Sequence, residues 1–174
     1  MSHKISNNLK GALGEIFTKN EFADYTLIDL TGNMSFTKLP GMPKEPDWPE
    51  SFNDLTEKEE NKFFKECDKI VEEQYKKLEL IYGTGTLPDY FVKHSKVFLE
   101  VKTGKSAKLE DSQKEGFQKL LEKGFRVFII KPNLLIEKFK FELLSFDCYE
   151  FLDADKKKKT TISEIKKIIS DTDF

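Results

Sequence analysis

The feature that most constrains the fold is the apolar run FRVFII at residues 125–130. A strand in which nearly every residue is apolar is typical of the centre of a sheet covered on both faces. A helix predicted over 109–123 precedes this strand and is ended by Gly124, in the usual role of a glycine after a helix. Such an arrangement predicts an α/β fold built on a central sheet.

The remaining elements complete that sheet. We predict, in chain order, a helix over 5–20, strands over 25–30, 89–93 and 96–102, one or two strands within 134–151, and a helix over 161–170. The strands 89–93 and 96–102 are joined by a tight turn at His94-Ser95. A hairpin followed by a helix and a further strand predicts a mixed sheet flanked by helices, within one domain of 174 residues.

An insertion of about 33–82 separates the first strand from the hairpin. Its first part, residues 38–50, holds four Pro and one Gly, which predicts a loop. A long helix over about 54–81 follows, and Thr56 with Glu59 forms a capping box at its start. The single apolar stripe of this helix predicts that it packs along most of its length. The core is then expected over 5–31 and 83–151.

The composition excludes several classes of protein. The two cysteines, Cys67 and Cys148, cannot make a disulfide framework, and with two histidines they share no zinc-ligand spacing. No run approaches the roughly 18 apolar residues of a membrane span. The N-terminal residues MSHKISNNLKGALGE contain no apolar signal core. We therefore expect an intracellular protein, cytoplasmic or at the nucleoid or nucleus, with no membrane partner.

The net charge of −2 disfavours a whole-surface binder of polyanions, but the basic residues are unevenly distributed. Residues 93–131 contain ten basic and five acidic side chains. Within this segment, Lys105 and Lys108 follow the strand 96–102 and are candidates for holding phosphates. Nucleic-acid binding is therefore expected to be local and sensitive to salt.

Three charged residues meet at the ends of the predicted hairpin. Asp89 begins one strand, and Glu100 and Lys102 lie on one face at the end of the next. The turn brings these ends together, so two carboxylates and an ammonium converge at one sheet edge. A hard divalent cation such as Mg²⁺ would relieve the repulsion between the carboxylates, and the backbone carbonyl of Val101 is a further candidate ligand.

The context of Glu100 and Lys102 carries this signal, because the triplet itself is common. Glu-x-Lys also occurs at Glu60–Lys62 and Glu164–Lys166, both in predicted helices. Only Asp89 is followed at hairpin distance by such a triplet inside an apolar strand. An inert sheet with a salt bridge is the alternative.

Pro88-Asp89, Glu100-Val101-Lys102 and a following helix with Gln113 resemble the PD-(D/E)XK nuclease superfamily. The pattern is similar to archaeal Holliday junction resolvases and VRR-NUC-type nucleases. The further matches are Leu109, Gln113, Leu120, Gly124 and Val127-Phe-Ile-Ile, together with Gly11-Ala-Leu-Gly-Glu15 in the first helix. The resemblance covers about residues 8–30 and 83–131.

The resemblance implies a restriction-endonuclease-like core with a metal-dependent site. Asp89 and Glu100 would be metal ligands and Lys102 the catalytic lysine. Glu15 would be an additional metal or water ligand, and Gln113 would support the site or contact DNA. The cofactor would be Mg²⁺, with Mn²⁺ able to substitute.

These observations favour a metal-dependent deoxyribonuclease, and among these an endonuclease, with branched or structured DNA as candidate substrates. One alternative is a non-catalytic nucleic-acid-binding protein that has kept the fold. Another is a restriction-type endonuclease that reads sequence through residues 38–82. The long helix is also a candidate dimerisation element, which would give a homodimer suited to symmetric substrates.

Overall fold

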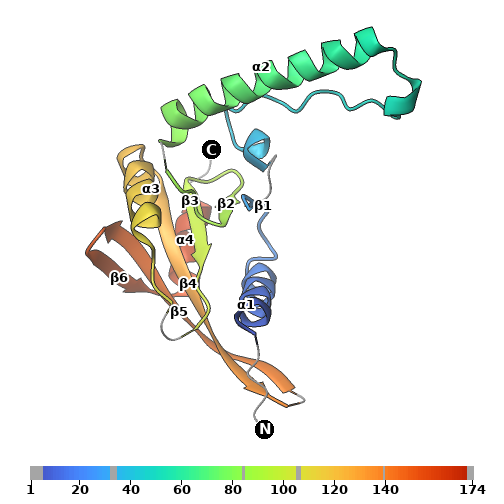
Figure 1. The fold of residues 1–174 in the computed structure, drawn as a ribbon. Helices are drawn as coiled ribbons and strands as arrows, with labels where there is room; N and C mark the ends of the chain where they lie inside the picture. Colours follow the sequence, from blue (N-terminus) through green and yellow to red (C-terminus); the bar gives the residue numbers. More distant parts are fainter. Residues whose placement is uncertain (1–5, 32–34, 84, 105–106, 139, 172–174) are drawn as a thin grey trace.

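The computed structural model describes residues 6–31, 35–83, 85–104, 107–138 and 140–171. Six strands form one sheet in the order β1-β2-β3-β4-β5-β6 (Figure 1). The strands are β1 Leu27–Asp29, β2 Tyr90–Val92, β3 Val97–Val101, β4 Arg126–Glu137, β5 Lys140–Asp153 and β6 Lys156–Thr160. Neighbouring strands are antiparallel except β3 and β4, which are parallel. The predicted α/β fold with a mixed sheet is confirmed.

The helices cover both faces of this sheet. They are α1 Asn7–Glu21, α2 Glu57–Tyr82, α3 Asp111–Glu122 and α4 Ile162–Asp171, with short 3₁₀ helices η1 Ser35–Lys38 and η2 Phe52–Asp54. On one face, Phe117 and Leu120 of α3 pack against sheet residues such as Phe98. On the other, Phe22 after α1 and Ile165 of α4 pack against residues such as Leu99. Two apolar cores therefore fix the sheet between its helices.

The central strand predicted at 125–130 is confirmed, and its length exceeds the prediction. Val127, Phe128 and Ile130 are fully buried, as expected of a strand between two covered faces. However, β4 continues through Pro132 to Glu137 and pairs with β5 beyond the body of the molecule (Figure 1). The lysine run at 156–159, which the sequence pattern did not identify as a strand, pairs with β5 as β6.

The hairpin that carries the charged residues forms as predicted. Tyr90 lies opposite Leu99, so Asp89 falls beside Glu100 at the same end of the pair. His94 takes the left-handed backbone conformation that the tight turn requires, with φ at 61°. The charged residues meet where the strand ends come together, at the carboxyl end of β3, which is an interior strand between β2 and β4.

Helix α2 begins as predicted, with Thr56 and Glu59 forming the capping box. Its apolar stripe is buried or half-buried at most positions along the helix, as predicted: Phe63, Cys67, Ile70, Gln74, Leu78 and Ile81. Tyr75 and Leu80 are each 71% exposed. The last turns of α2 pack against the sheet core, and the Pro-rich segment runs beside the part that projects from the sheet (Figure 1).

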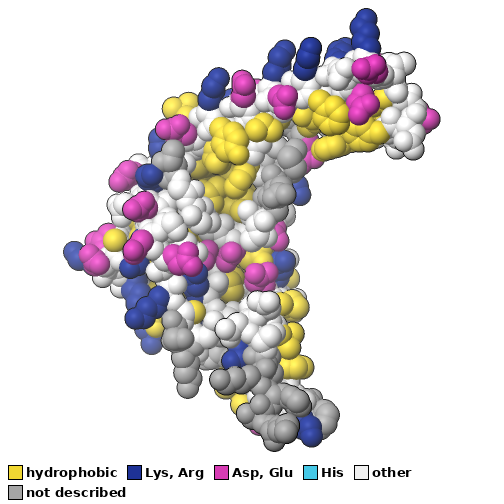
Figure 2. Space-filling view, in the orientation of Figure 1, with side chains coloured by type: hydrophobic (Ala, Val, Ile, Leu, Met, Phe, Trp, Pro, Cys, Tyr) yellow, Lys and Arg dark blue, Asp and Glu magenta, His cyan; other side chains and the backbone are white. Residues whose placement is uncertain are grey.

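The part of α2 far from the sheet packs on its own insertion. Phe63 contacts Trp48 and Phe52, with ring centroids 5.4 and 5.6 Å away, and Phe52 stacks on Phe64. Figure 2 shows a strip of hydrophobic side chains on the side of α2 that faces the rest of the molecule. In the described part of the chain, no helix has the length and apolar character needed to cross a membrane.

Candidate active site

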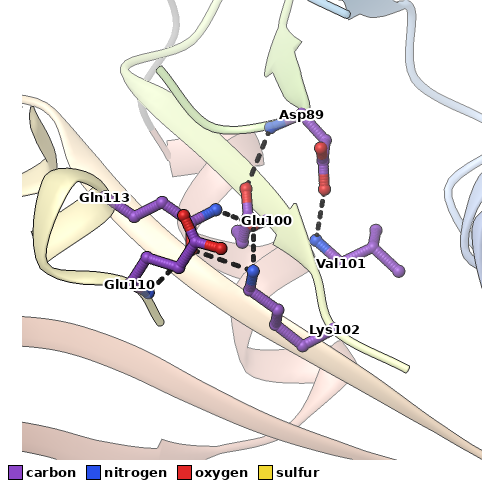
Figure 3. Close-up of polar contacts among 6 residues, drawn as sticks. All are labelled: Asp89, Glu100, Val101, Lys102, Glu110 and Gln113. Carbon is purple, nitrogen blue, oxygen red and sulfur yellow. Dashed lines mark hydrogen bonds and ion pairs between the residues drawn. The ribbon is translucent and has the colours of Figure 1, made fainter. Parts of the chain in front are cut away.

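Asp89 and Glu100 are tied to each other through the backbone of the β2–β3 hairpin (Figure 3). The Asp89 amide donates to Glu100 Oε2 at 3.2 Å, and the Val101 amide donates to Asp89 Oδ2 at 2.8 Å. Each carboxylate therefore accepts a hydrogen bond from the strand that carries the other. This exchange holds two acidic side chains next to each other at the end of β3.

Lys102 and Gln113 complete a closed network around Glu100. The Lys102 ammonium lies 3.2 Å from Glu100 Oε1 and donates to Gln113 Oε1 at 2.9 Å. Gln113 Nε2 in turn donates to Glu100 Oε1 at 2.8 Å. The three side chains thus form a triangle of charge-assisted hydrogen bonds, which are stronger than neutral ones.

The start of α3 fixes the position of Gln113. Gln113 is the third residue of α3, and its Oε1 also accepts from the Glu110 amide at 3.0 Å. A side chain at this position commonly turns back to satisfy the free amides of a helix start. The same capping geometry directs Gln113 toward Lys102 (Figure 3). The sequence predicted Gln113 at the site but not the contribution of Glu110.

Burial gives the two carboxyl groups unusual proton affinities. Burial, followed by the negative charge of Asp89, raises the pKa of Glu100 to about 7, although Lys102 opposes the shift. Burial also raises the pKa of Asp89, and the charge of Glu15 adds to this effect, against the hydrogen bond from Val101 and the charge of Lys102. A cation that binds here would compensate for the cost of holding both groups ionised.

Glu15 approaches the site from α1, on the side of Asp89. It accepts a hydrogen bond from the Tyr90 hydroxyl at 3.3 Å. Gly14 makes this approach close, because a Cβ there would overlap Thr103 Oγ1 in the segment after β3. Glu15 thus lies near enough to act on Asp89 electrostatically, while the network of Glu100, Lys102 and Gln113 lies on the α3 side.

The donors at this site fit a hard divalent cation with few protein ligands. Asp89 and Glu100 supply adjacent carboxylates, the preferred ligands of Mg²⁺, which usually keeps several waters. Among the described residues, no group of three or more His, Cys, Asp and Glu side chains is arranged to hold a metal ion. A cation at Asp89 and Glu100 would take its remaining ligands from water, from substrate or from the further groups predicted from the sequence. The Val101 carbonyl and Glu15 stay predicted ligands.

Of the two lysines predicted to bind phosphates, Lys105 lies outside the described residues. Lys108 is exposed in the segment before α3 and lines one open groove together with Lys102. Lys131 of β4 and Lys157 of β6 line the same groove, and sequence reasoning did not place them there. Strand alternation puts Lys131 on the face of Ile129, but only the strand order shows that this face adjoins Lys102.

Comparison of the chain with known proteins finds no matching family model, no matching curated protein and no matching solved structure.

Proposed function

We propose that the protein is a Mg²⁺-dependent nuclease that hydrolyses phosphodiester bonds in DNA. The observation that carries the proposal is the pair of adjacent carboxylates, half-buried Asp89 and buried Glu100, with Lys102 beside Glu100. Such a group is costly in an inert sheet, because burial penalises both charges. The resemblance to PD-(D/E)XK nucleases supports the same chemistry.

Asp89 and Glu100 would hold the divalent cation. When bound, the cation supplies positive charge for the phosphate oxygens and lowers the pKa of a coordinated water. Glu15, which lies on the Asp89 side, would orient water rather than contact Glu100. Its role in the proposal is therefore to help position the nucleophile.

Lys102 is the residue that would act on the reacting groups. A water oxygen attacks phosphorus and the bond from phosphorus to the 3′-oxygen breaks. The water gives up one proton, the departing 3′-oxygen takes one up to become the 3′-hydroxyl, and the other product keeps a 5′-phosphate. The Lys102 ammonium can donate to a phosphoryl oxygen as negative charge gathers there. Gln113 would act as a positioning residue, because it holds both Lys102 and Glu100.

A cleavage panel tests the proposal. Branched, single-stranded and duplex DNA, and RNA of the same sequence, are incubated with Mg²⁺, Mn²⁺ or EDTA. We expect cleavage with either metal, none in EDTA, and loss of activity in Asp89→Asn and Glu100→Gln. Glu122→Gln, an exposed charge change at the end of α3, is the matched control and should remain active.

The panel also separates the rival functions. A protein that binds DNA but cuts none of the substrates would be the non-catalytic binding protein. Cleavage only at particular duplex sequences would favour the restriction-type enzyme. Full activity in Asp89→Asn and Glu100→Gln would reject the site itself.

A further inference from the structure

An open groove of about 430 Å³ adjoins Lys102 on the α3 face of the sheet. Its apolar lining includes Ile129 of β4 and Tyr149 and Phe151 of β5. Six lysines from four parts of the chain surround it: Lys102, Lys108, Lys114, Lys131, Lys156 and Lys157. We call these residues and the space between them the lysine groove. Figure 2 shows dark-blue side chains on the flank that carries the start of α3 and β6.

Only two of these lysines have a carboxylate partner within 4.0 Å among the described residues. Lys102 pairs with Glu100 and Lys114 with Asp111. Within the described ranges, no carboxylate lies within 4.0 Å of the ammonium groups of the remaining four, which are Lys108, Lys131, Lys156 and Lys157. Asp153 and Asp155 also line the groove, so six positive and two negative side chains leave a net charge of +4. The groove therefore concentrates positive charge on a protein whose net charge is −2.

Lys157 and Lys108 lie close enough to Lys131 to act on it electrostatically. Burial lowers the pKa of Lys131, and the positive charges of Lys157 and Lys108 lower it further, while Asp147 opposes them. Lys157 Nζ lies 4.2 Å from the centre of the Tyr149 ring, which holds its side chain over β5. An anion between these lysines would relieve their repulsion.

We propose that the lysine groove binds the sugar-phosphate backbone of one nucleic-acid strand and leads that strand to Lys102. The positive charge of the groove indicates a polyanionic ligand. That this ligand is a nucleic acid rests on the proposed nuclease function. The strand would leave the site across β4, β5 and β6, on the α3 side of the sheet. The turn before β6 thus belongs to the substrate-binding surface.

The outer face of α2 provides a matched surface with the same kind of side chain. Lys58, Lys62, Lys65 and Lys69 line a shallow depression there, together with Glu57 and Glu66. Those lysines lie on one exposed helix outside the lysine groove. Removing two charges from α2 changes the net charge as much as removing two from the groove. The two surfaces can therefore be compared directly.

The test measures binding without cleavage. Fluorescence polarisation in EDTA follows labelled single-stranded DNA, duplex DNA and RNA with the wild type, Lys131→Met/Lys157→Met and Lys62→Met/Lys65→Met. Methionine keeps an apolar chain over Tyr149. Each lost phosphate contact reduces the slope of log affinity against log salt concentration by about 0.7–0.9. The groove variant loses two such contacts and should therefore bind about 25–60-fold more weakly at about 0.1 M salt. The α2 variant should bind like the wild type.

Each outcome separates this inference from the proposed function. Loss of binding in the groove variant alone supports the groove, even if the wild type cleaves nothing. Equal affinity and salt slope in the groove variant and the α2 variant would overturn it, even if the wild type cleaves DNA. Failure of the wild type to bind any of the three probes would also overturn it. The probe that binds most tightly identifies the class of strand.

Discussion

Replacing Glu100 by glutamine should stabilise the metal-free protein at alkaline pH. Glu100 is 3% exposed, and burial together with Asp89 raises its pKa from the ordinary 4.5 to about 7. Between these two values the folded protein keeps a proton on Glu100 that the unfolded chain has lost. The free energy of unfolding of the wild type therefore falls as pH rises through this window. Glutamine resembles the protonated carboxyl group and carries no such cost.

The size of the effect follows from the pKa. A shift from 4.5 to about 7 corresponds to at most about 3.4 kcal/mol, at about 1.36 kcal/mol per pH unit. Asp89 shares the repulsion with Glu100, and the variant loses the charged partner of Lys102. We therefore expect Glu100→Gln to be more stable than the wild type by about 1–3 kcal/mol at pH ~8. At pH ~4.5, near the ordinary pKa, the two proteins should have nearly equal stability.

Urea unfolding in EDTA measures this difference across the pH range. Glu122→Gln, exposed on the last turn of α3, is the control and should follow the wild type at each pH. Addition of Mg²⁺ at pH ~8 should then raise the stability of the wild type and have little effect on Glu100→Gln, because a ligand stabilises the state that binds it. A variant that is less stable than the wild type at this pH would refute the reasoning. So would a difference in stability that does not change with pH.

Two further substitutions probe the surroundings of the carboxylates. Lys102→Met should lower the cleavage rate by about 10²–10³-fold, the usual effect of losing one electrostatic donor. It should leave Mg²⁺ affinity equal or higher, because the ammonium 3.2 Å from Glu100 competes with the metal. Calorimetry of Mg²⁺ binding and timed cleavage on the same sample separate the two effects. Loss of Mg²⁺ binding in this variant would show that Lys102 is a structural support. Gly14→Ala should destabilise the fold by about 1–3 kcal/mol, because its Cβ would overlap Thr103. Gly11→Ala, where the added Cβ has no neighbouring atom within 4 Å, should instead stabilise α1 by about 0.5–1 kcal/mol in thermal unfolding. Equal effects of the two substitutions would show that α1 does not pack closely against the segment after β3.

The sequence alone determined the elements that depend on neighbours close in the chain. The Thr56–Glu59 capping box, the His94-Ser95 turn and the apolar strand at 125–130 all follow from short-range spacing. The same short-range logic brought Asp89, Glu100 and Lys102 together, because a tight hairpin leaves little freedom in which strand ends meet. Gln113 was predicted from the resemblance, and the structure places it in hydrogen-bond contact with two of these residues.

Tertiary structure decided the features that depend on which distant segments become neighbours. Periodicity shows that a strand has an apolar face but not which strands flank it, and only the structure places β3 in the interior, between β2 and β4. An apolar stripe likewise does not say what covers it, and the stripe of α2 is covered in part by its own insertion, where Trp48 contacts Phe63. The lysines of β4 and β6 meet near Lys102 only through pairing with β5. Strand order is fixed by the burial of whole faces, a property of the assembled sheet that no single stretch of sequence contains.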